Sequence, residues 1–291
     1  MRLGYSITSF HGSAEPRAAA RSVLRRAEVA REAGFDYVQV GDHHVVADGL
    51  YLQNVPTAAR LGGVFDRVGA MFLLPLYDPV LLAEQVGTLD ALVEGFDFWC
   101  ALGYQERSFR AFDVPMDERV PRFEEALDLL GRLWREDEVT FRGRFYDVEG
   151  VSVNPKADPR VVIGGGVEAA VRRAARLGDA WVSLPNETLA DLEREIGWVR
   201  EEGGGEVLAR RDVVALEDGD RARAACEDLL AAGYRGWPAD AEWPLAGDAD
   251  DLAAAFGRLR DLGVDEVVVR PMSDEHAEET LRVVAEARDR M

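Results

Sequence analysis

The stretch VVIGGGVEAAVRRAARLGDAWV, residues 161–182, contains a complete strand, turn, helix and strand pattern. Its opening apolar run predicts a strand that is covered on both faces, as strands of parallel sheets are. Three glycines separate this strand from an amphipathic helix that ends at Gly178, and a second apolar run follows over 180–184. A strand, a helix and another strand in succession predict an α/β protein with a parallel sheet.

The same pattern recurs along the chain. EAGFDYVQV (32–40), VEGFDFWCA (93–101) and DLGVDEVVV (261–269) also end a helix with glycine and begin a strand after aspartate. The glycines suit the left-handed position that stops a helix; they are Gly34, Gly95, Gly178 and Gly263. Strands are predicted at 3–7, 37–41, 68–74, 97–102, 161–164, 180–184, 212–216 and 266–270.

Eight parallel strands with helices between them predict a (β/α)8 TIM barrel that forms one domain over residues 1–291. An open doubly wound sheet is the alternative, but it usually has fewer strands. We expect an insertion between strands four and five, at about 104–160. It would contain a helix over 119–135 and a hairpin, VTFRGRFYDVEGV (139–151), that turns at Gly143. Before it, Asp78 and Pro79 are suited to begin a helix over 79–94.

The composition is strongly acidic. Lys and Arg number 34 against 54 Asp and Glu, a formal net charge of −20 that repels nucleic acid and anionic membranes. GC-rich coding explains why Lys156 is the single lysine but not the excess of acid, so we favour a halophilic, haloarchaeal source. Two cysteines, no secretory signal and no long apolar segment predict a cytoplasmic protein.

Active sites of such barrels lie at the carboxyl ends of the strands. His11 follows the first predicted strand, and GDHHV (41–45) follows the second. Gly103 and Tyr104 end the fourth strand, and Gly164, Gly165 and Gly166 end the fifth. These separate stretches are expected to converge at one rim of the barrel.

The three glycines before the helix have two interpretations. Backbone N–H groups and the helix dipole at a helix start attract phosphate, and glycine lets the backbone approach it closely. A tight turn that requires glycine for steric reasons is the alternative. The stretch lacks the G-x-G-x-x-G arrangement of the dinucleotide fingerprint.

The GDHHV stretch has three interpretations. A metal site needs three or four converging ligands, and neighbouring residues of a strand point to opposite faces, so His43 and His44 would rarely bind one ion. No metal is therefore expected. A histidine filling the barrel mouth is the second interpretation. In the third, Asp42 orients His43 beside a bound ligand. A G-x-S-x-G elbow is absent, which argues against acyl-transfer chemistry.

Four stretches together strongly resemble the bacterial luciferase-like flavin-dependent oxidoreductases. They are YVQVGDHH (37–44), GAMFLLPLYDPVLLAEQVGTLDALVEG (69–95), RFEEALDLLGRLWREDEVTFRGRFYDVEGVSVNPK (122–156) and residues 161–182. The resemblance weakens over 185–245. It implies the barrel, with reduced FMN or the deazaflavin coenzyme F420 as cofactor. Among the site residues it implies, Asp42 and His43 stand at the cofactor ring and the substrate.

The resemblance also assigns a cofactor-binding segment. Met71, Phe72, Leu73 and Leu74 would form a bulge, often with a non-proline cis peptide, that backs the ring. Gly164 and Gly165 would hold the cofactor phosphate, with Gly166 beside them. Gly103 and Tyr104 would contribute at the fourth strand, and Tyr104 and His11 are candidate substrate contacts.

One departure lies in FWCALGY (98–104). Trp99 and Ala101 occupy two positions where the family usually has glycine, and only Gly103 remains. Tyr104 stands where the related sugar-phosphate dehydrogenases place a catalytic glutamate, and Glu106 lies two residues on, so sugar-phosphate oxidation is disfavoured.

We expect an enzyme that uses coenzyme F420 to transfer hydride to or from a small organic substrate, as a homodimer or higher oligomer. A reduced-FMN monooxygenase that uses O2 is the close alternative. A cofactor-binding barrel without turnover and a metal-dependent barrel hydrolase are further alternatives.

Overall fold

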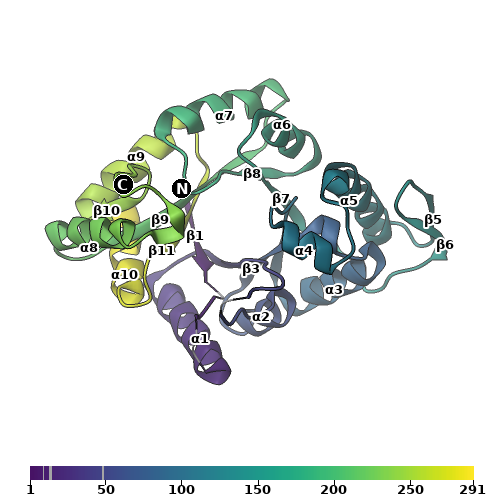
Figure 1. Cartoon of the computed structure of the whole chain (residues 1–291), viewed down its shortest axis with the longest axis horizontal. Coiled ribbons are helices and arrows are strands. Elements are labelled where there is room, and N and C mark those ends of the chain that lie inside the picture. Colours follow the sequence, from purple (N-terminus) through teal and green to yellow (C-terminus); the bar gives the residue numbers. More distant parts are fainter. Residues whose placement is uncertain (9, 13–14, 48) are drawn as a thin grey trace. The chain divides into compact units, whose positions relative to one another are not determined.

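A computed structural model of the chain describes residues 1–8, 10–12, 15–47 and 49–291. A parallel sheet runs in the order β10-β9-β11-β1-β2-β3-β4-β7-β8, and β8 also pairs with β9, so the sheet closes on itself. This arrangement confirms the predicted (β/α)8 barrel, with β10 as an additional strand beside β9 (Figure 1). The strands are β1 (Arg2–Ile7), β2 (Tyr37–Val40), β3 (Arg67–Leu73), β4 (Gly95–Ala101), β7 (Arg160–Gly164), β8 (Ala180–Val182), β9 (Glu206–Ala215), β10 (Leu245–Gly247) and β11 (Glu266–Pro271).

Helices follow the strands of the barrel. The α-helices are α1 (Pro16–Ala33), α2 (Asn54–Leu61), α3 (Pro79–Leu92), α4 (Glu106–Ala111), α5 (Arg119–Arg135), α6 (Glu168–Leu177), α7 (Leu189–Glu201), α8 (Gly219–Ala231), α9 (Ala249–Leu262) and α10 (Ala277–Asp289). Short 3₁₀ helices are η1 (Leu74–Leu76), η2 (Met116–Glu118) and η3 (Tyr234–Gly236). Among the described residues, no helix combines the length and the apolar character that crossing a membrane requires.

The chain forms two compact units. The first contains Met1–Thr8, Arg21–Val38 and Val162–Met291, and the second contains Ser9–Ala20 and Gln39–Val161. The chain passes between units within β2 and β7, so the closed sheet takes strands from both. The single domain over residues 1–291 stays a prediction.

The second unit is built around β3 and β4, which pair in register from Arg67 with Gly95 to Leu73 with Ala101. Phe72 stacks on Phe98 with the ring centroids 5.1 Å apart, and Phe98 meets Trp134 of α5 edge-on. These rings are buried and fill the layer between the strands and α5. The aromatic packing fixes which face of each strand points toward the helices, because side chains of a strand alternate between faces.

The first unit is built around β9, which pairs with β8, β10 and β11. The sequence predicted this strand only over 212–216, whereas it begins at Glu206. The strand β10 was not predicted. Around β9–β11, helices α8, α9 and α10 gather on one side, and α6 and α7 flank β8 (Figure 1).

Helix ends follow the predicted chemistry in part. The side chain of Asp78 accepts hydrogen bonds from the backbone N–H groups of Val80 and Leu81 at 3.0 Å, which confirms the predicted cap. Gly34 and Gly263 have the left-handed backbone that was predicted for them. Gly178 is extended instead, and Gly95 lies inside β4 and lacks the left-handed conformation. At both of these places the chain turns directly into the next strand, so the prediction was wrong there.

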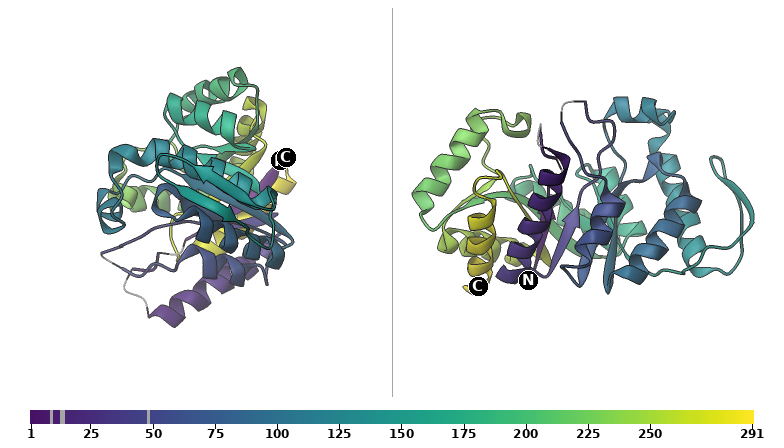
Figure 2. Two further views of the ribbon diagram at one scale, coloured as in Figure 1. Left: turned by 90° about the vertical axis from the view of Figure 1, so that its right-hand side faces the viewer. Right: turned by 90° about the horizontal axis from the view of Figure 1, so that it is seen from below.

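Helix α5 has the predicted bounds, and a hairpin follows it. Its strands are β5 (Val139–Arg142) and β6 (Asp147–Val151), paired antiparallel, with the turn closed by a bond from the N–H of Gly143 to the carbonyl of Tyr146. The hairpin projects beyond α3 and α5 of its unit (Figure 2). That this segment is an insertion stays an interpretation.

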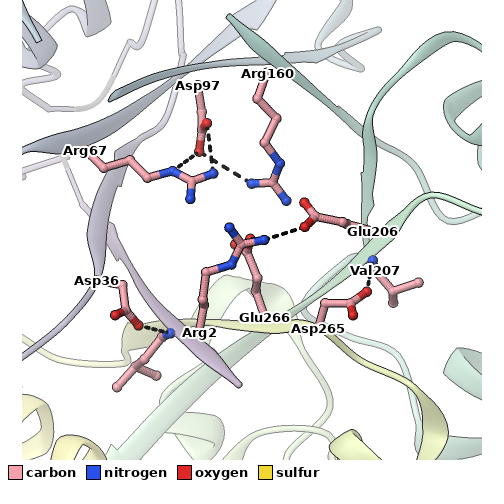
Figure 3. A network of polar contacts seen from close by, with 10 residues as sticks. Arg2, Asp36, Arg67, Asp97, Arg160, Glu206, Val207, Asp265 and Glu266 are labelled. Atoms are coloured by element: carbon pink, nitrogen blue, oxygen red, sulfur yellow. Dashed lines mark hydrogen bonds and ion pairs between the residues drawn. The ribbon is translucent and has the colours of Figure 1, made fainter. Parts of the chain in front are cut away.

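Charged side chains near the amino ends of the strands, among them the buried Asp97 and Glu266, are paired within each unit (Figure 3). In the first unit, Arg2 contacts Glu206 at 2.5 Å and Glu266 at 2.6 Å. In the second unit, Asp97 accepts hydrogen bonds from Arg67 and lies 3.5 Å from Arg160. Pairing offsets the cost of removing these charges from water, so we interpret these ends as structural.

Candidate active site

Asp42 lies just after β2 and is 3% exposed. Its Oδ2 atom accepts hydrogen bonds from the backbone N–H of Leu73 at 2.8 Å and from the Tyr77 hydroxyl at 2.9 Å. Burial, and then the charge of Asp42, raise the pKa of Tyr77 well above its usual value. The phenol therefore keeps its proton and stays a donor to the carboxylate. Asp42 thus ties the end of β2 to the end of β3.

Asn54, at the start of α2, completes this attachment. Its Nδ2 atom donates to the carbonyl of Met71 at 2.6 Å and lies 3.2 Å from the Tyr77 hydroxyl. Because Asn54 and Asp42 are both buried, these bonds exchange little with water. Three side chains, Asp42, Asn54 and Tyr77, therefore hold the backbone of the strand-three segment in place. We call them the Asp42 clamp.

His44 is the histidine that contacts Asp42. Its Nε2 atom lies 3.1 Å from Oδ1 of Asp42, and its ring meets Tyr77 and Phe112 edge-on. The sequence predicted that Asp42 orients His43, and this assignment stays a prediction beside the observed contact with His44. The expectation that His44 packs against its surroundings is confirmed by its burial. Strand-like alternation explains both results, because Asp42 and His44 point to the same side.

His43 points elsewhere and is partly exposed. Its ring meets that of Tyr51 edge-on, with the centroids 4.8 Å apart. Tyr51 also pairs with Phe10 in an antiparallel bridge, and the N–H of His11 donates to the carbonyl of Leu50 at 2.9 Å. The segments that carry His11 and His43 are therefore linked through residues 50–51. The structure brings these two candidates into one neighbourhood.

The strand-three segment divides into two faces. Phe72 and Leu74 are fully buried in the layer toward the helices, whereas Met71 and Leu73 are partly exposed. Met71 and Leu73 are therefore the side chains of this segment that stay partly accessible, and the role of residues 71–74 as the backing of a cofactor ring stays a prediction. Among the described residues the one cis peptide joins Asn154 to Pro155, so the non-proline cis peptide expected near Leu73 is not seen.

Trp99 is 1% exposed and lies inside the second unit. A Cβ atom placed on Gly69 would lie 2.6 Å from Nε1 of this indole and 3.3 Å from Cγ of Gln39. In the register of β3 and β4, however, Trp99 pairs with Met71, two residues beyond Gly69. The indole therefore leans toward the amino end of β3 and fills the space that glycine leaves.

The end of β4 is built from small residues. Ala101 pairs with Leu73, and Gly103 has a left-handed backbone with φ of +78°. A Cβ atom on Gly103 would approach Phe109 at 3.2 Å and Leu73 at 3.6 Å, so a larger residue would crowd this corner. Tyr104 is 73% exposed to solvent. Ala101 and Gly103 thus keep the end of β4 small beside Leu73.

The glycines after β7 have steric reasons to be glycine. A Cβ atom on Gly165 would lie 2.6 Å from Cβ of Ala170, and one on Gly166 would lie 2.6 Å from a methyl carbon of Leu184. Helix α6 begins at Glu168 and is followed by Gly178, as predicted. Gly165 and Gly166 therefore have steric reasons to be glycine, and phosphate binding by this loop stays a prediction.

Two carboxylates border the same loop. Oε1 of Glu187 would lie 2.7 Å from a Cβ atom on Gly166, and Glu168 lies in the first turn of α6. Burial raises the pKa of Glu187, which favours its neutral form. Phosphate binding at Gly164, Gly165 and Gly166 is compatible with the loop only where this carboxyl holds its proton.

Sequence reasoning missed Tyr77 and Asn54. Asn54 begins α2 and Tyr77 follows η1. Polar residues are common at such positions, so residue type alone gives no reason to assign them to a site. The available signal was the LYDP stretch (76–79), since a tyrosine directly after an apolar strand end is placed to reach a buried carboxylate. Among the described residues, no group of three or more His, Cys, Asp or Glu could hold a metal ion.

The closed parallel sheet makes this chain a (β/α)8 barrel, and its polar side chains follow the strands, where enzymes of this fold have their active sites. The chain belongs to the luciferase-like monooxygenase family, whose family model matches residues 1–287. This match confirms the family that the sequence resembles.

Curated relatives in this family include users of both cofactors. The chain is 26% identical over 219 residues to the FMNH2-dependent dimethylsulfone monooxygenase of Pseudomonas fluorescens, covering 70% of this chain and 60% of that protein. It is 29% identical over 169 residues to the F420-dependent glucose-6-phosphate dehydrogenase of Microbacterium testaceum, covering 53% of this chain and 50% of that protein. The chain therefore matches between half and two thirds of the length of these relatives.

A solved structure extends the likeness to the whole chain. The monooxygenase RslO1 from Streptomyces bottropensis superposes with a TM-score of 0.85 over 99% of this chain and 98% of that one, at 22% sequence identity. At this identity the superposition supports the barrel fold.

Proposed function

We propose that this chain is a flavin-type oxidoreductase that uses coenzyme F420 to transfer hydride to or from a small organic substrate. Such a cofactor supplies a ring carbon that accepts or donates the hydride. The protein supplies binding, orientation and proton control around that ring. The proposal rests on the Asp42 clamp, because the clamp fixes the strand-three segment where family resemblance puts the ring.

The position of the Asp42 clamp supports the proposal, and so does the free-energy cost of burying its polar side chains. Two buried side chains bind the backbone of this segment, Asn54 at the carbonyl of Met71 and Asp42 at the N–H of Leu73. The Tyr77 hydroxyl contacts both of these side chains. A simple strand end needs no such attachment, whereas a surface that must match a planar ring gains from being held rigidly. Met71, Leu73, Ala101 and Gly103 would line this surface.

His43 is the residue that we propose to act on the substrate. Its ring is partly exposed and is held edge-on by Tyr51, while the neighbouring His44 is buried against Asp42. A histidine titrates near neutral pH, so His43 can donate a hydrogen bond or a proton to a substrate oxygen. His11 and the exposed Tyr104 are proposed as further substrate contacts.

The glycine loop after β7 is proposed to hold a cofactor phosphate through its backbone N–H groups. The support is the start of α6 directly after Gly164, Gly165 and Gly166, where the helix dipole attracts an anion. Gly165→Asp adds both bulk and negative charge, so it should lower cofactor affinity strongly. Gly197→Ala is the matched control, because that helical glycine faces open space.

A reduced-FMN monooxygenase that uses O2 is the second candidate. The relative in Pseudomonas fluorescens is FMNH2-dependent, and Tyr104 stands where sugar-phosphate dehydrogenases place a glutamate. Anaerobic titration of the purified chain with reduced FMN and with F420 separates the candidates. Tighter binding of F420 supports hydride transfer, whereas tighter binding of reduced FMN with substrate-dependent O2 uptake supports oxygenation. A barrel that binds a cofactor and turns over no substrate would contradict both.

A further inference from the structure

A cluster of arginines lies in the middle of β9 and near the carboxyl end of β11 in the first unit. Arg211 of β9 lies among Glu187 and Glu195, on the side of α7. Because strand neighbours alternate between faces, Arg210 and Asp212 lie on the opposite face of β9. Arg270 of β11 pairs in register with Asp212 and therefore shares that face. This is the inner face of the sheet, away from α7.

Two further residues reach this face from the segment after α8. The Tyr234 hydroxyl donates to Oδ2 of Asp212 at 2.7 Å, and Nε of Arg235 lies 2.9 Å from the same oxygen. Arg235 itself has a left-handed backbone, with φ of +52°. A non-glycine residue in that conformation is strained, and such strain persists where the surroundings fix the side chain.

The charges of this cluster do not balance. Asp212 is the carboxylate that acts most strongly on Arg210, whereas Arg235 and Arg270 add positive charge. Asp212 already binds Arg235 and Tyr234. Arg270 donates to the uncharged Thr8 hydroxyl at 3.0 Å. Burial, opposed by Asp212 and assisted by Arg235 and Arg270, lowers the pKa of Arg210 to about 10. A chain with net charge −20 thus concentrates positive charge at one interior place.

Two buried N–H groups in or near the cluster could donate a hydrogen bond to a ligand. The Nε atom of Arg210 is buried and has no hydrogen-bond partner among the residues that the structure describes. The same holds for Nε1 of Trp243, which packs edge-on against Trp237. Arg235 lies over the ring of Trp237 at 5.6 Å. Buried donors without partners are costly, so a ligand that satisfies them would be bound firmly.

We propose that Arg210, Arg235 and Arg270 form an oxyanion-binding site that holds a carboxylate, sulfonate or phosphate group. These residues stand at the seventh and eighth strands of the barrel, where barrel enzymes frequently bind phosphate. The group belongs to the substrate of the proposed oxidoreductase, on which this assignment rests, or to its cofactor. In the second case the cluster takes the phosphate-binding role proposed for the glycine loop after β7. Guanidinium groups match the planar or forked geometry of such oxyanions.

Calorimetric titration of the full chain with inorganic phosphate tests the site. We expect binding that weakens about tenfold or more in Arg210→Gln and in Arg270→Gln, because each removes a charged donor. Arg282→Gln, an exposed arginine of α10, is the matched control and should leave binding unchanged. Unfolding curves check that each variant folds. If Arg210→Gln does not fold, Arg235→Gln on the exposed segment replaces it. Absent phosphate binding, or equal binding by all variants, overturns the proposal.

A second arm identifies the source of the oxyanion. Reduced FMN and reduced riboflavin differ in the phosphate alone, so their affinities are compared in the parent chain and in Arg270→Gln. A loss for FMN but not for riboflavin assigns the site to the cofactor phosphate. Unchanged affinities for both, with phosphate binding lost, assign it to the substrate. If neither flavin nor F420 binds while phosphate still does, the proposed function fails and the oxyanion site stands.

Discussion

The hydroxyl of Tyr77 donates a hydrogen bond of 2.9 Å to the carboxylate of Asp42, and the same carboxylate oxygen receives the N–H of Leu73. One buried oxygen thus joins the end of β2 to the end of β3 and the start of α3. The relationship gives the aspartate of the DHH stretch a role in positioning backbone. His43, the partly exposed histidine of this stretch, is the residue that we propose to act on the substrate.

Tyr77→Phe should destabilise the chain and weaken cofactor binding. The change removes the donor from a buried carboxylate and leaves Asn54 with one bond fewer, at a cost of about 1–3 kcal/mol in the free energy of unfolding. Denaturant unfolding and cofactor titration measure both effects. Tyr104→Phe is the control for stability, because that side chain is exposed. Unchanged stability and affinity in Tyr77→Phe would remove the Asp42 clamp from this account.

Substitution of His43 should affect turnover, whereas substitution of His44 should affect stability. His43→Ala is expected to lower turnover by about 10²-fold or more while most cofactor affinity remains, as loss of a general acid does. His44→Ala removes a buried ring that contacts Tyr77 and Phe112, so it should lower stability first. Steady-state kinetics and thermal unfolding of both variants make the comparison. Equal loss of turnover at normal stability in His44→Ala would reverse these roles.

Gly69 and Trp99 should be energetically coupled. Gly69→Ala puts a methyl group 2.6 Å from the indole nitrogen, and overpacking of this kind costs about 1–3 kcal/mol. A smaller ring in Trp99→Phe should cost stability alone but relieve Gly69→Ala in the double variant. A double-mutant cycle measures this coupling. Simple additivity of the two changes would show that the indole does not occupy the space over Gly69.

Glu195 predicts a pH dependence of stability. Burial, and then the charge of Glu187, raise the pKa of Glu195 to about 9 in the folded chain. Between the usual carboxyl range and this value, the folded state holds a proton that the unfolded state releases. The free energy of unfolding therefore falls as pH rises through this window.

Glu195→Gln keeps the shape of the protonated carboxyl and removes this titration. At pH 8 the variant should exceed the parent chain in stability by about 1 kcal/mol or more, and near pH 5 the difference should shrink. Glu193→Gln, on the exposed side of the same helix, is the control. A variant that is less stable than the parent chain at pH 8 would contradict the buried acid pair.

The sequence predicted the barrel because its strands are apolar runs and its helices end at recognisable residues. The strand β9 was predicted too short for a physical reason. Arg210 and Arg211 interrupt the apolar run, and the burial of Arg211 depends on carboxylates from another segment, Glu187 and Glu195. When the partners of charged residues are distant in sequence, the local pattern does not show whether the residues belong to a buried strand or to an exposed loop.

The sequence predicted which segments carry candidate site residues, but it did not predict the contacts between those residues. Position after a strand located Asp42, His43 and the glycines, since that depends on local pattern alone. The contact of Asp42 with His44 was not predicted, because choosing between His43 and His44 requires the direction of each side chain. Tyr77 and Asn54 were missed, because their role arises only when α2 and η1 are packed beside β3.

Anaerobic equilibrium titration of the purified chain with F420 and with reduced FMN tests the central claim most directly. The account predicts that at least one of them binds at about micromolar concentration and that Tyr77→Phe weakens this binding, because the Asp42 clamp holds the ring surface. Failure of both cofactors to bind the folded chain at that concentration would contradict it.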